Sequence, residues 1–135
     1  MIVVDASFVI AHVLGEDTTV EQANFIETLR QEQLVAPAHW PAEISNALVT
    51  NVRRKRISME NIGLILRELA TYNIEIRPAF AGDAARLIAI SSEQNLTAYD
   101  AAYVILAMDL EASIATLDKA MRQAAGRLNL NVLPV

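Results

Sequence analysis

The chain opens with MIVVDASFVI (residues 1–10), and this stretch decides the fold. Apolar residues run without interruption into a single carboxylate, Asp5, and a second apolar run follows it. A strand this short, with no polar alternation, is expected to be covered on both faces, as in a parallel sheet. A lone charge at its end is costly to bury unless it is hydrogen-bonded or neutralised by a cation. The stretch therefore predicts a buried strand that stops at an acid and passes into a helix.

Length and composition limit what the chain is expected to be. Its 135 residues suit one compact domain, residues 1–135, and its net charge of −5 argues against general electrostatic binding of nucleic acid. The apolar fraction of 53% is slightly high, a weak indication of self-association or of a partner surface. The lack of cysteine excludes disulfides and thiolate metal sites and is compatible with the cytoplasm. We expect neither a secretory signal nor a membrane span, because no stretch approaches the roughly 20 apolar residues that a span requires.

Short apolar segments alternate with helical patterns along the whole chain. Proline is expected to end the second strand, at Pro37, and to begin the following helix, at Pro41. Thr18 or Thr19, Ser58 and Thr97 are expected to cap helices. Strands are expected at residues 2–4, 34–36, 74–76, 113–116 and 131–133, and helices at 6–14, after 18–19, at 42–52, after 58, at 83–92, 98–110 and 119–128. Strands separated by helices predict an α/β fold with a parallel sheet and right-handed crossovers.

Four of the sixteen acids differ from the others because each lies at a strand end or a helix start among apolar or small neighbours. Asp5 follows the first strand and Asp118 follows the fourth. Glu43 and Asp100 lie in the first turns of two helices. Open α/β sheets bind ligands in the crevice outside the carboxyl ends of their strands. We therefore expect Asp5, Glu43 and Asp118 to reach this edge, and Asp100 to join them if its helix lies alongside the crevice.

An ordinary structural explanation competes with this one. Acids in a first helical turn interact favourably with the helix dipole, by about 0.3–1 kcal/mol, without any catalytic role. Taken one at a time, Glu43, Asp100 and Asp118 can each be explained in this way. Clustered carboxylates, however, repel one another unless a cation lies among them. Oxygen ligands without cysteine or histidine suit Mg²⁺ or Mn²⁺.

The segments around these acids resemble the four acidic motifs of the PIN-domain nucleases, over essentially the whole chain. The motifs are VVDASFVI with Asp5, PAEISNAL with Glu43, TAYDAAYVILA with Asp100 and ATLD with Asp118. Length and motif order are similar to those of the VapC-type toxins of toxin–antitoxin pairs. The resemblance implies a three-layer α/β/α fold with the first strand central in a mostly parallel sheet. It also implies a Mg²⁺ or Mn²⁺ site, cleavage of RNA, a VapB-type antitoxin and a homodimer.

The hypothesis assigns a role to each residue of this site. Asp5 and Asp100 are the main metal ligands, Glu43 is a ligand or a base that orients water, and Asp118 is a second-metal or outer-shell ligand. Ser7 and Thr116 match hydroxyl positions that the family uses around the acids.

Residues outside the acidic motifs carry weaker signals. The basic run Arg53, Arg54, Lys55 and Arg56 could contact RNA phosphates, or it could only complement the end of a helix. His39 and Trp40 could stack on a base, although packing is favoured for Trp40. Tyr99 and Tyr103 are interpreted as core or interface residues.

Two alternatives to an antitoxin-controlled nuclease stay open. One is a PIN-like module that binds without catalysis, and the other is a stand-alone PIN nuclease. Phosphatases of the haloacid-dehalogenase type are disfavoured because Ser7 stands where they need a second acid. Response-regulator receivers are disfavoured because Asp5 lacks an adjacent acid. Nucleotide-binding motifs of the GxGxxG or GxxxxGK[ST] type are absent from the sequence.

Overall fold

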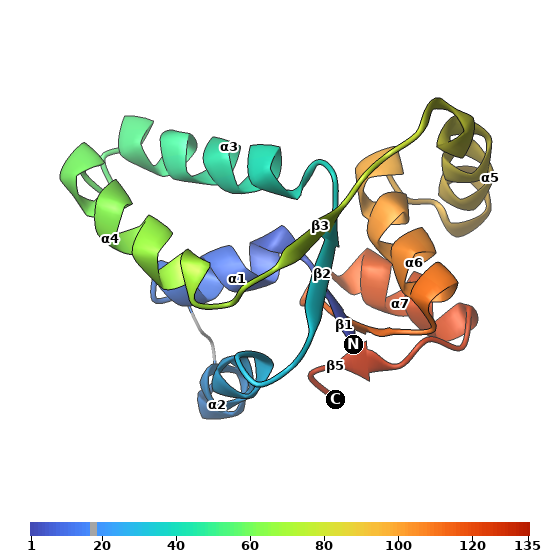
Figure 1. The fold of residues 1–135 in the computed structure, drawn as a ribbon, viewed down its shortest axis with the longest axis horizontal. Helices are drawn as coiled ribbons and strands as arrows, with labels where there is room; N and C mark the ends of the chain where they lie inside the picture. The colour runs from blue at the N-terminus through green and yellow to red at the C-terminus, as the bar shows by residue number, and fades with distance from the viewer. Residues whose placement is uncertain (17–18) are drawn as a thin grey trace.

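A computed structural model describes residues 1–16 and 19–135 of the chain, and at its centre lies a five-stranded sheet (Figure 1). The strand order is β3-β2-β1-β4-β5, and all four neighbouring pairs are parallel. The first strand is central, as predicted. The strands are β1 (Ile2–Val4), β2 (Leu34–Pro37), β3 (Glu75–Arg77), β4 (Ser113–Ala115) and β5 (Val132–Leu133).

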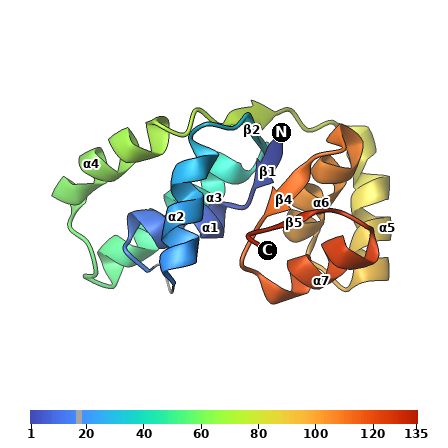
Figure 2. The same ribbon diagram turned by 90° about the horizontal axis from the view of Figure 1, so that it is seen from below.

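Helices cover both faces of the sheet and complete three layers, which confirms the predicted α/β/α fold (Figure 2). Ile2 and Val4 point into one apolar cluster and Val3, between them, points into the other, because successive side chains of a strand alternate between faces. The first cluster packs under α1 (Ala6–Val13), α2 (Val20–Leu29), α3 (Trp40–Arg53) and α4 (Met59–Ala70). The second packs under α5 (Ala84–Gln94), α6 (Ala98–Leu110) and α7 (Lys119–Arg127).

Both expectations about proline were off by one residue. Pro37 ends β2 as its last residue rather than as the first residue after it, and at this position β2 still pairs with β3 but has passed its paired positions with β1. A proline is tolerated at such a position because no central ladder bond needs its missing N–H. The following helix begins at Trp40 rather than Pro41, which lies within its first turn.

The expected caps are present with one difference in bonding. Thr19 accepts a hydrogen bond from the Gln22 N–H (3.0 Å) and Thr97 from the Asp100 N–H (3.1 Å), whereas Thr18 lies outside the described residues. Ser58 stands at the start of α4, but its hydroxyl donates to the Asn61 side chain (2.7 Å) instead of capping the backbone. A single 3₁₀ turn, Ala81–Asp83, precedes α5.

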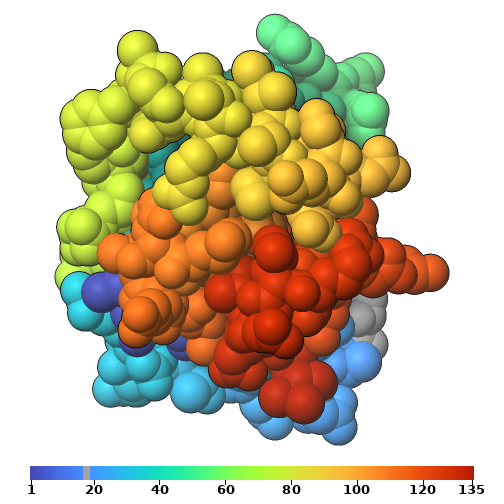
Figure 3. All heavy atoms as spheres, turned by 90° about the vertical axis from the view of Figure 1, so that its right-hand side faces the viewer, coloured from blue at the N-terminus to red at the C-terminus, as the bar shows by residue number. Residues whose placement is uncertain are grey.

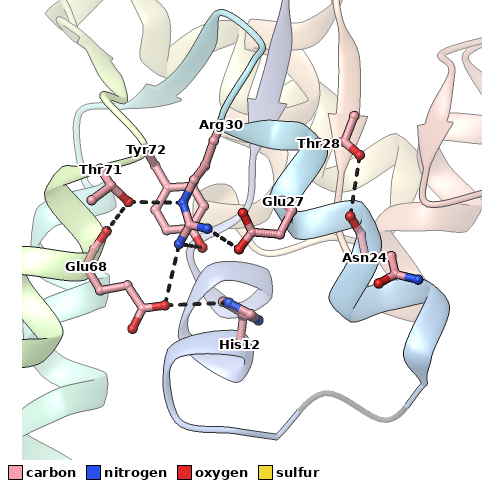
Figure 4. Close-up of polar contacts among 8 residues, drawn as sticks. All are labelled: His12, Asn24, Glu27, Thr28, Arg30, Glu68, Thr71 and Tyr72. Carbon is pink, nitrogen blue, oxygen red and sulfur yellow. Dashed lines mark hydrogen bonds and ion pairs between the residues drawn. The ribbon is translucent and has the colours of Figure 1, made fainter.

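A polar cluster around Arg30 ties three helices together on one side of the sheet (Figure 4). The Arg30 guanidinium lies 4.7 Å from the Tyr72 ring centroid and donates to the Tyr72 hydroxyl (3.2 Å) and to Thr71 (3.1 Å). It also pairs with Glu27 of α2 and lies 3.6 Å from Glu68 of α4. Glu68 in turn lies 3.6 Å from the imidazole of His12 on α1. These contacts hold the ends of α2 and α4 over α1.

Candidate active site

The four acids of the sequence hypothesis all lie where the carboxyl ends of the strands meet the starts of helices. Asp5 follows β1 and is the N-cap of α1, and Asp118 follows β4 and is the N-cap of α7. Glu43 and Asp100 lie in the first turns of α3 and α6. β1 and β4 are neighbours, and the Asp5 N–H donates to the Ala115 carbonyl (3.0 Å). The edge of the sheet therefore gathers these helix starts.

Asp5 is the most enclosed of the four, with 3% of its surface exposed. Its Oδ2 accepts hydrogen bonds from the Ser7 hydroxyl (2.7 Å) and the buried Thr116 hydroxyl (2.8 Å), and its Oδ1 accepts one from the Ser7 N–H (3.2 Å). In the described part of the chain, no lysine, arginine or histidine forms an ion pair with Asp5, Asp100 or Asp118. The Asp5 carboxylate is thus held in a fixed orientation by hydroxyls rather than by a protein cation.

Electrostatics link the four carboxylates. Burial raises the pKa of the Asp100 carboxyl, and the charges of Asp118, Asp5 and Glu43 raise it further. Burial likewise raises the pKa of Asp5; hydrogen bonds from Ser7 and Thr116 oppose that rise, and the charge of Glu43 adds to it. The other three acids therefore lie close enough to Asp100 for their charges to disfavour its ionised form.

Glu43 has two partners that were not assigned from the sequence, although His39 lies four residues before it, a spacing at which helical side chains are neighbours. Its Oε1 accepts a short hydrogen bond from the Tyr103 hydroxyl (2.6 Å), and His39 Nε2 lies 2.9 Å from the same oxygen. Burial raises the pKa of Glu43, but the contacts with His39 and Tyr103 outweigh burial and hold that pKa below its usual value. Burial, together with the bond to Glu43, strongly raises the pKa of Tyr103. Glu43 is thus kept ionised and in place.

Tyr103 also connects Glu43 to the Asp5 segment. Its hydroxyl oxygen accepts a hydrogen bond from the backbone N–H of Ala6 (3.3 Å). Ala6 is the first helical residue after Asp5. Tyr103 is fully buried, so its interpretation as a core residue is confirmed, but its hydroxyl belongs to the site. In the sequence, the one indication that Tyr103 belongs to the site was its spacing of three residues from Asp100, which puts both residues on the same helix face.

Thr116 and Asp118, which follow β4, form the side of the site next to Asp5. The Asp118 N–H donates to Thr116 Oγ1 (3.0 Å), and Asp118 Oδ1 accepts from the Met121 N–H (2.8 Å). The segment is fastened by Arg122, whose guanidinium donates to the carbonyls of Thr116 (2.8 Å), Leu133 (3.3 Å) and Pro134 (2.8 Å). Arg122 was not singled out from the sequence, because a basic residue in a helix usually faces solvent.

The structure does not bring the basic run to the acids. Residues 53–56 are exposed at the far end of α3, ten residues beyond Glu43. At 1.5 Å per residue, this places the run about 15 Å along the helix axis from Glu43. Any contact it makes with RNA would therefore be remote from the carboxylates.

The donor set suits Mg²⁺ or Mn²⁺, since it consists of carboxylate and hydroxyl oxygens. Across residues 1–16 and 19–135, no group of three carboxylate or imidazole side chains is placed so that it could hold one ion. Mg²⁺ commonly keeps several waters and contacts only one or two carboxylates together with substrate phosphates. The arrangement therefore fits an open, partly hydrated ion and does not fit a closed cage of protein ligands.

Comparisons with known proteins agree with the geometry. A family model described as PIN domain matches residues 2–127. The crystal structure of PAE2754 from Pyrobaculum aerophilum superposes with a TM-score of 0.68 at 22% sequence identity, covering 91% of this chain and 78% of that one. At this identity the likeness concerns the fold alone. No curated protein matches the sequence significantly. No helix among the described residues is long and apolar enough to cross a membrane.

Proposed function

The chain belongs to the PIN domain family, whose fold is that of nucleases, and from this premise we propose that it is a metal-dependent endoribonuclease. Residues 1–135 form its nuclease domain. Asp5, Glu43, Asp100 and Asp118 form its catalytic and metal-binding site, with Ser7 and Thr116 in support. A Mg²⁺ or Mn²⁺ ion bound there would lower the pKa of an attacking water and polarise the scissile phosphate.

One observation carries the proposal: four carboxylates from the starts of α1, α3, α6 and α7 gather at one edge of the sheet. Burial raises the pKa of Asp100, and the charges of the other three acids raise it further. Gathering like charges costs free energy, and the described residues supply no cation to Asp5, Asp100 or Asp118. A divalent cation would remove this repulsion. An excess of negative charge is what one expects of a site that binds a divalent cation.

The remaining residues act by positioning. Ser7 and Thr116 hydroxyls orient the Asp5 carboxylate, so that it need not reorganise when an ion arrives. Tyr103 and His39 hold Glu43 ionised, as required of an acceptor for a proton from water. Asp118, which is exposed, is the most accessible of the four acids to an ion or a substrate at the surface.

RNA is the proposed substrate, in single-stranded or looped form, because unstacked strands can enter a site lined by carboxylates. We further propose that the protein is a cytoplasmic toxin of the VapBC type, a homodimer held inactive by a VapB-type antitoxin. The motif order and the slight apolar excess support that assignment. A stand-alone PIN nuclease would share the chemistry without the antitoxin, and a binding module would lack the chemistry.

The test compares cleavage of a labelled single-stranded RNA by wild-type protein with cleavage by Asp5→Asn and Asp100→Asn, in Mg²⁺ and in EDTA. We expect each substitution, and EDTA, to reduce the rate on the order of 100-fold or more. Glu93→Gln, which removes an exposed acid on α5, is the control and should leave the rate unchanged. Wild-type rates in either variant, or in EDTA, would refute the assignment.

Thermal unfolding with and without Mg²⁺ separates the enzyme from the binding module. An ion that binds only the folded state raises the melting temperature, and the rise should be lost in Asp100→Asn. An unchanged melting temperature in the wild type, together with no cleavage, would favour the non-catalytic module. Co-expression with the product of any short reading frame found next to the gene tests the antitoxin.

A further inference from the structure

A groove of about 390 Å³ lies beside the acidic site. Of its lining residues, only His39 has a role in the proposed reaction. The groove runs between the end of β2, the segment of residues 77–80 and α6, and Figure 3 shows the face on which it opens, between the yellow-green and the orange atoms. Its lining is mainly apolar and includes Pro37, Ala98, Ala102 and Leu106. The volume is within the range of sites that hold small organic groups.

Exposed aromatic side chains gather at this groove. The chain has seven phenylalanine, tyrosine and tryptophan residues, all in the described part of the structure. Of these seven, only Phe80 (69% exposed) and Tyr99 (67% exposed) are largely exposed to solvent, and both line the groove. They come from different segments, the loop after β3 and the first turn of α6. Two flat apolar rings left in water at one groove indicate a flat apolar ligand.

The groove is continuous with the acidic site through His39, which lines it. The His39 ring makes edge contacts with Tyr99 (centroids 5.4 Å apart) and Tyr103 (5.3 Å), and its Nε2 lies 2.9 Å from Glu43. Tyr99 also directly precedes Asp100 in the sequence. A ligand in the groove would therefore lie one side chain, His39, away from the proposed catalytic acid Glu43.

The charged residues of the groove are already occupied within the protein. Arg86 pairs with Asp109 (2.8 Å), Arg77 lies 3.2 Å from Glu75, and Asp83 accepts a hydrogen bond from the Phe80 N–H (2.9 Å). The groove therefore offers no concentrated charge to attract a phosphate or an acidic peptide. The groove suits a ligand whose uncharged aromatic ring lies inside it and whose charged group lies outside it, at the carboxylate site.

We propose that this groove is a nucleobase subsite, in which a base next to the scissile phosphate of single-stranded RNA stacks on Tyr99 and Phe80. The inference rests on the proposed ribonuclease function and deepens it. Stacking on aromatic side chains is a general way in which proteins hold unpaired bases. The subsite orients the strand so that the adjoining phosphate faces Glu43 and Asp100.

The experiment measures cleavage and binding of a labelled RNA strand, and of the same strand with one base at a time removed to leave an abasic ribose. Phe80→Ala and Tyr99→Ala should weaken binding about 5- to 150-fold, mainly as a rise in KM, the range expected for losing one stacked base. One abasic position should weaken wild-type binding similarly, and on that strand the two variants should show no further loss. Ile88→Ala, equally exposed at 67% but outside the groove, is the matched control.

A second variant, Ala102→Phe, fills the groove without removing either aromatic ring and should weaken binding as much as Tyr99→Ala. Wild-type KM values in all three groove variants, with RNA still cleaved, would overturn the subsite and leave the ribonuclease proposal standing. Groove variants that alter only the oligomeric state in sedimentation would overturn it in favour of a contact with a second copy. Base-dependent binding by a wild-type protein that cleaves no RNA would support the subsite and refute the proposed function.

Discussion

Replacing Tyr103 by phenylalanine removes one oxygen atom that serves both halves of the site. In the folded protein this hydroxyl donates to Glu43 (2.6 Å) and accepts from the Ala6 N–H (3.3 Å). A hydrogen bond to a charged group contributes about 1.5–3 kcal/mol, and we take the lower end because the Glu43 side chain is 35% exposed. The Ala6 N–H, on a buried residue, loses its partner at a further cost of about 1 kcal/mol. We therefore expect Tyr103→Phe to lower the free energy of unfolding by about 2.5 kcal/mol at pH 7.

The pH dependence of this loss follows from the Glu43 carboxyl, whose pKa lies below its usual value of 4.5 in the folded protein. A depressed carboxyl pKa contributes stability that is present above pH 4.5 and is lost as the pH falls through the folded pKa. The difference between wild type and Tyr103→Phe should therefore be full at pH 7 and shrink below pH 4.5. Urea unfolding at pH 7 and at a pH below 4.5 measures this difference in the free energy of unfolding. The control is Tyr99→Phe, which removes an exposed hydroxyl and should differ from wild type by less than about 0.5 kcal/mol. A Tyr103→Phe protein as stable as wild type at pH 7, or a difference that grows on acidification, would refute the reasoning.

Four further outcomes follow from other parts of the structure. Arg122→Met leaves three backbone carbonyls without their donor and should lower the free energy of unfolding by about 2–4 kcal/mol in urea. Arg30→Met should cost about 1–2 kcal/mol in the same assay, because it removes the contacts that hold α2 and α4 together. Burial raises the pKa values of Asp5 and Asp100, so protons compete with the ion and calorimetry should show Mg²⁺ binding weakening as the pH falls from 7 to 5. Arg54→Ala should leave the kcat for RNA cleavage unchanged. If the basic run contacts phosphate, the substitution should make the slope of log binding constant against log salt concentration shallower by about 0.7.

Much of the fold was predictable because its signals are local. The central strand is apolar throughout, and its acid, Asp5, falls where the strand must end. Asp100 was predictable for the same reason: Thr97 caps α6, and the apolar residues that follow orient the helix against the sheet. Pro37 was misjudged because its place in β2 depends on which neighbouring strand reaches it, and local sequence does not report that.

Two supporting residues of the site, Tyr103 and Arg122, were harder to predict because their contacts depend on segments that tertiary folding brings together. Tyr103 reaches Glu43 across 60 positions and Ala6 across 97. Its position on an apolar helix face predicted burial, but burial does not reveal which partner a hydroxyl meets. Arg122 is similar, since its partners become available only when β4 and the C-terminal segment lie side by side. Local patterns locate the acids, whereas tertiary packing decides what holds them.

The structural and the functional explanations of the four acids are compatible. Asp5 and Asp118 are N-caps, and Glu43 and Asp100 lie in first helical turns, so each acid does interact with a helix N-terminus. The positive ends of these helix dipoles point towards the same edge of the sheet and reduce the free-energy cost of assembling carboxylates there. They do not remove it, because the pKa of Asp100 remains raised by burial and by the other three charges. Helix capping therefore leaves some repulsion between the carboxylates uncompensated. A bound divalent cation would relieve this remaining repulsion.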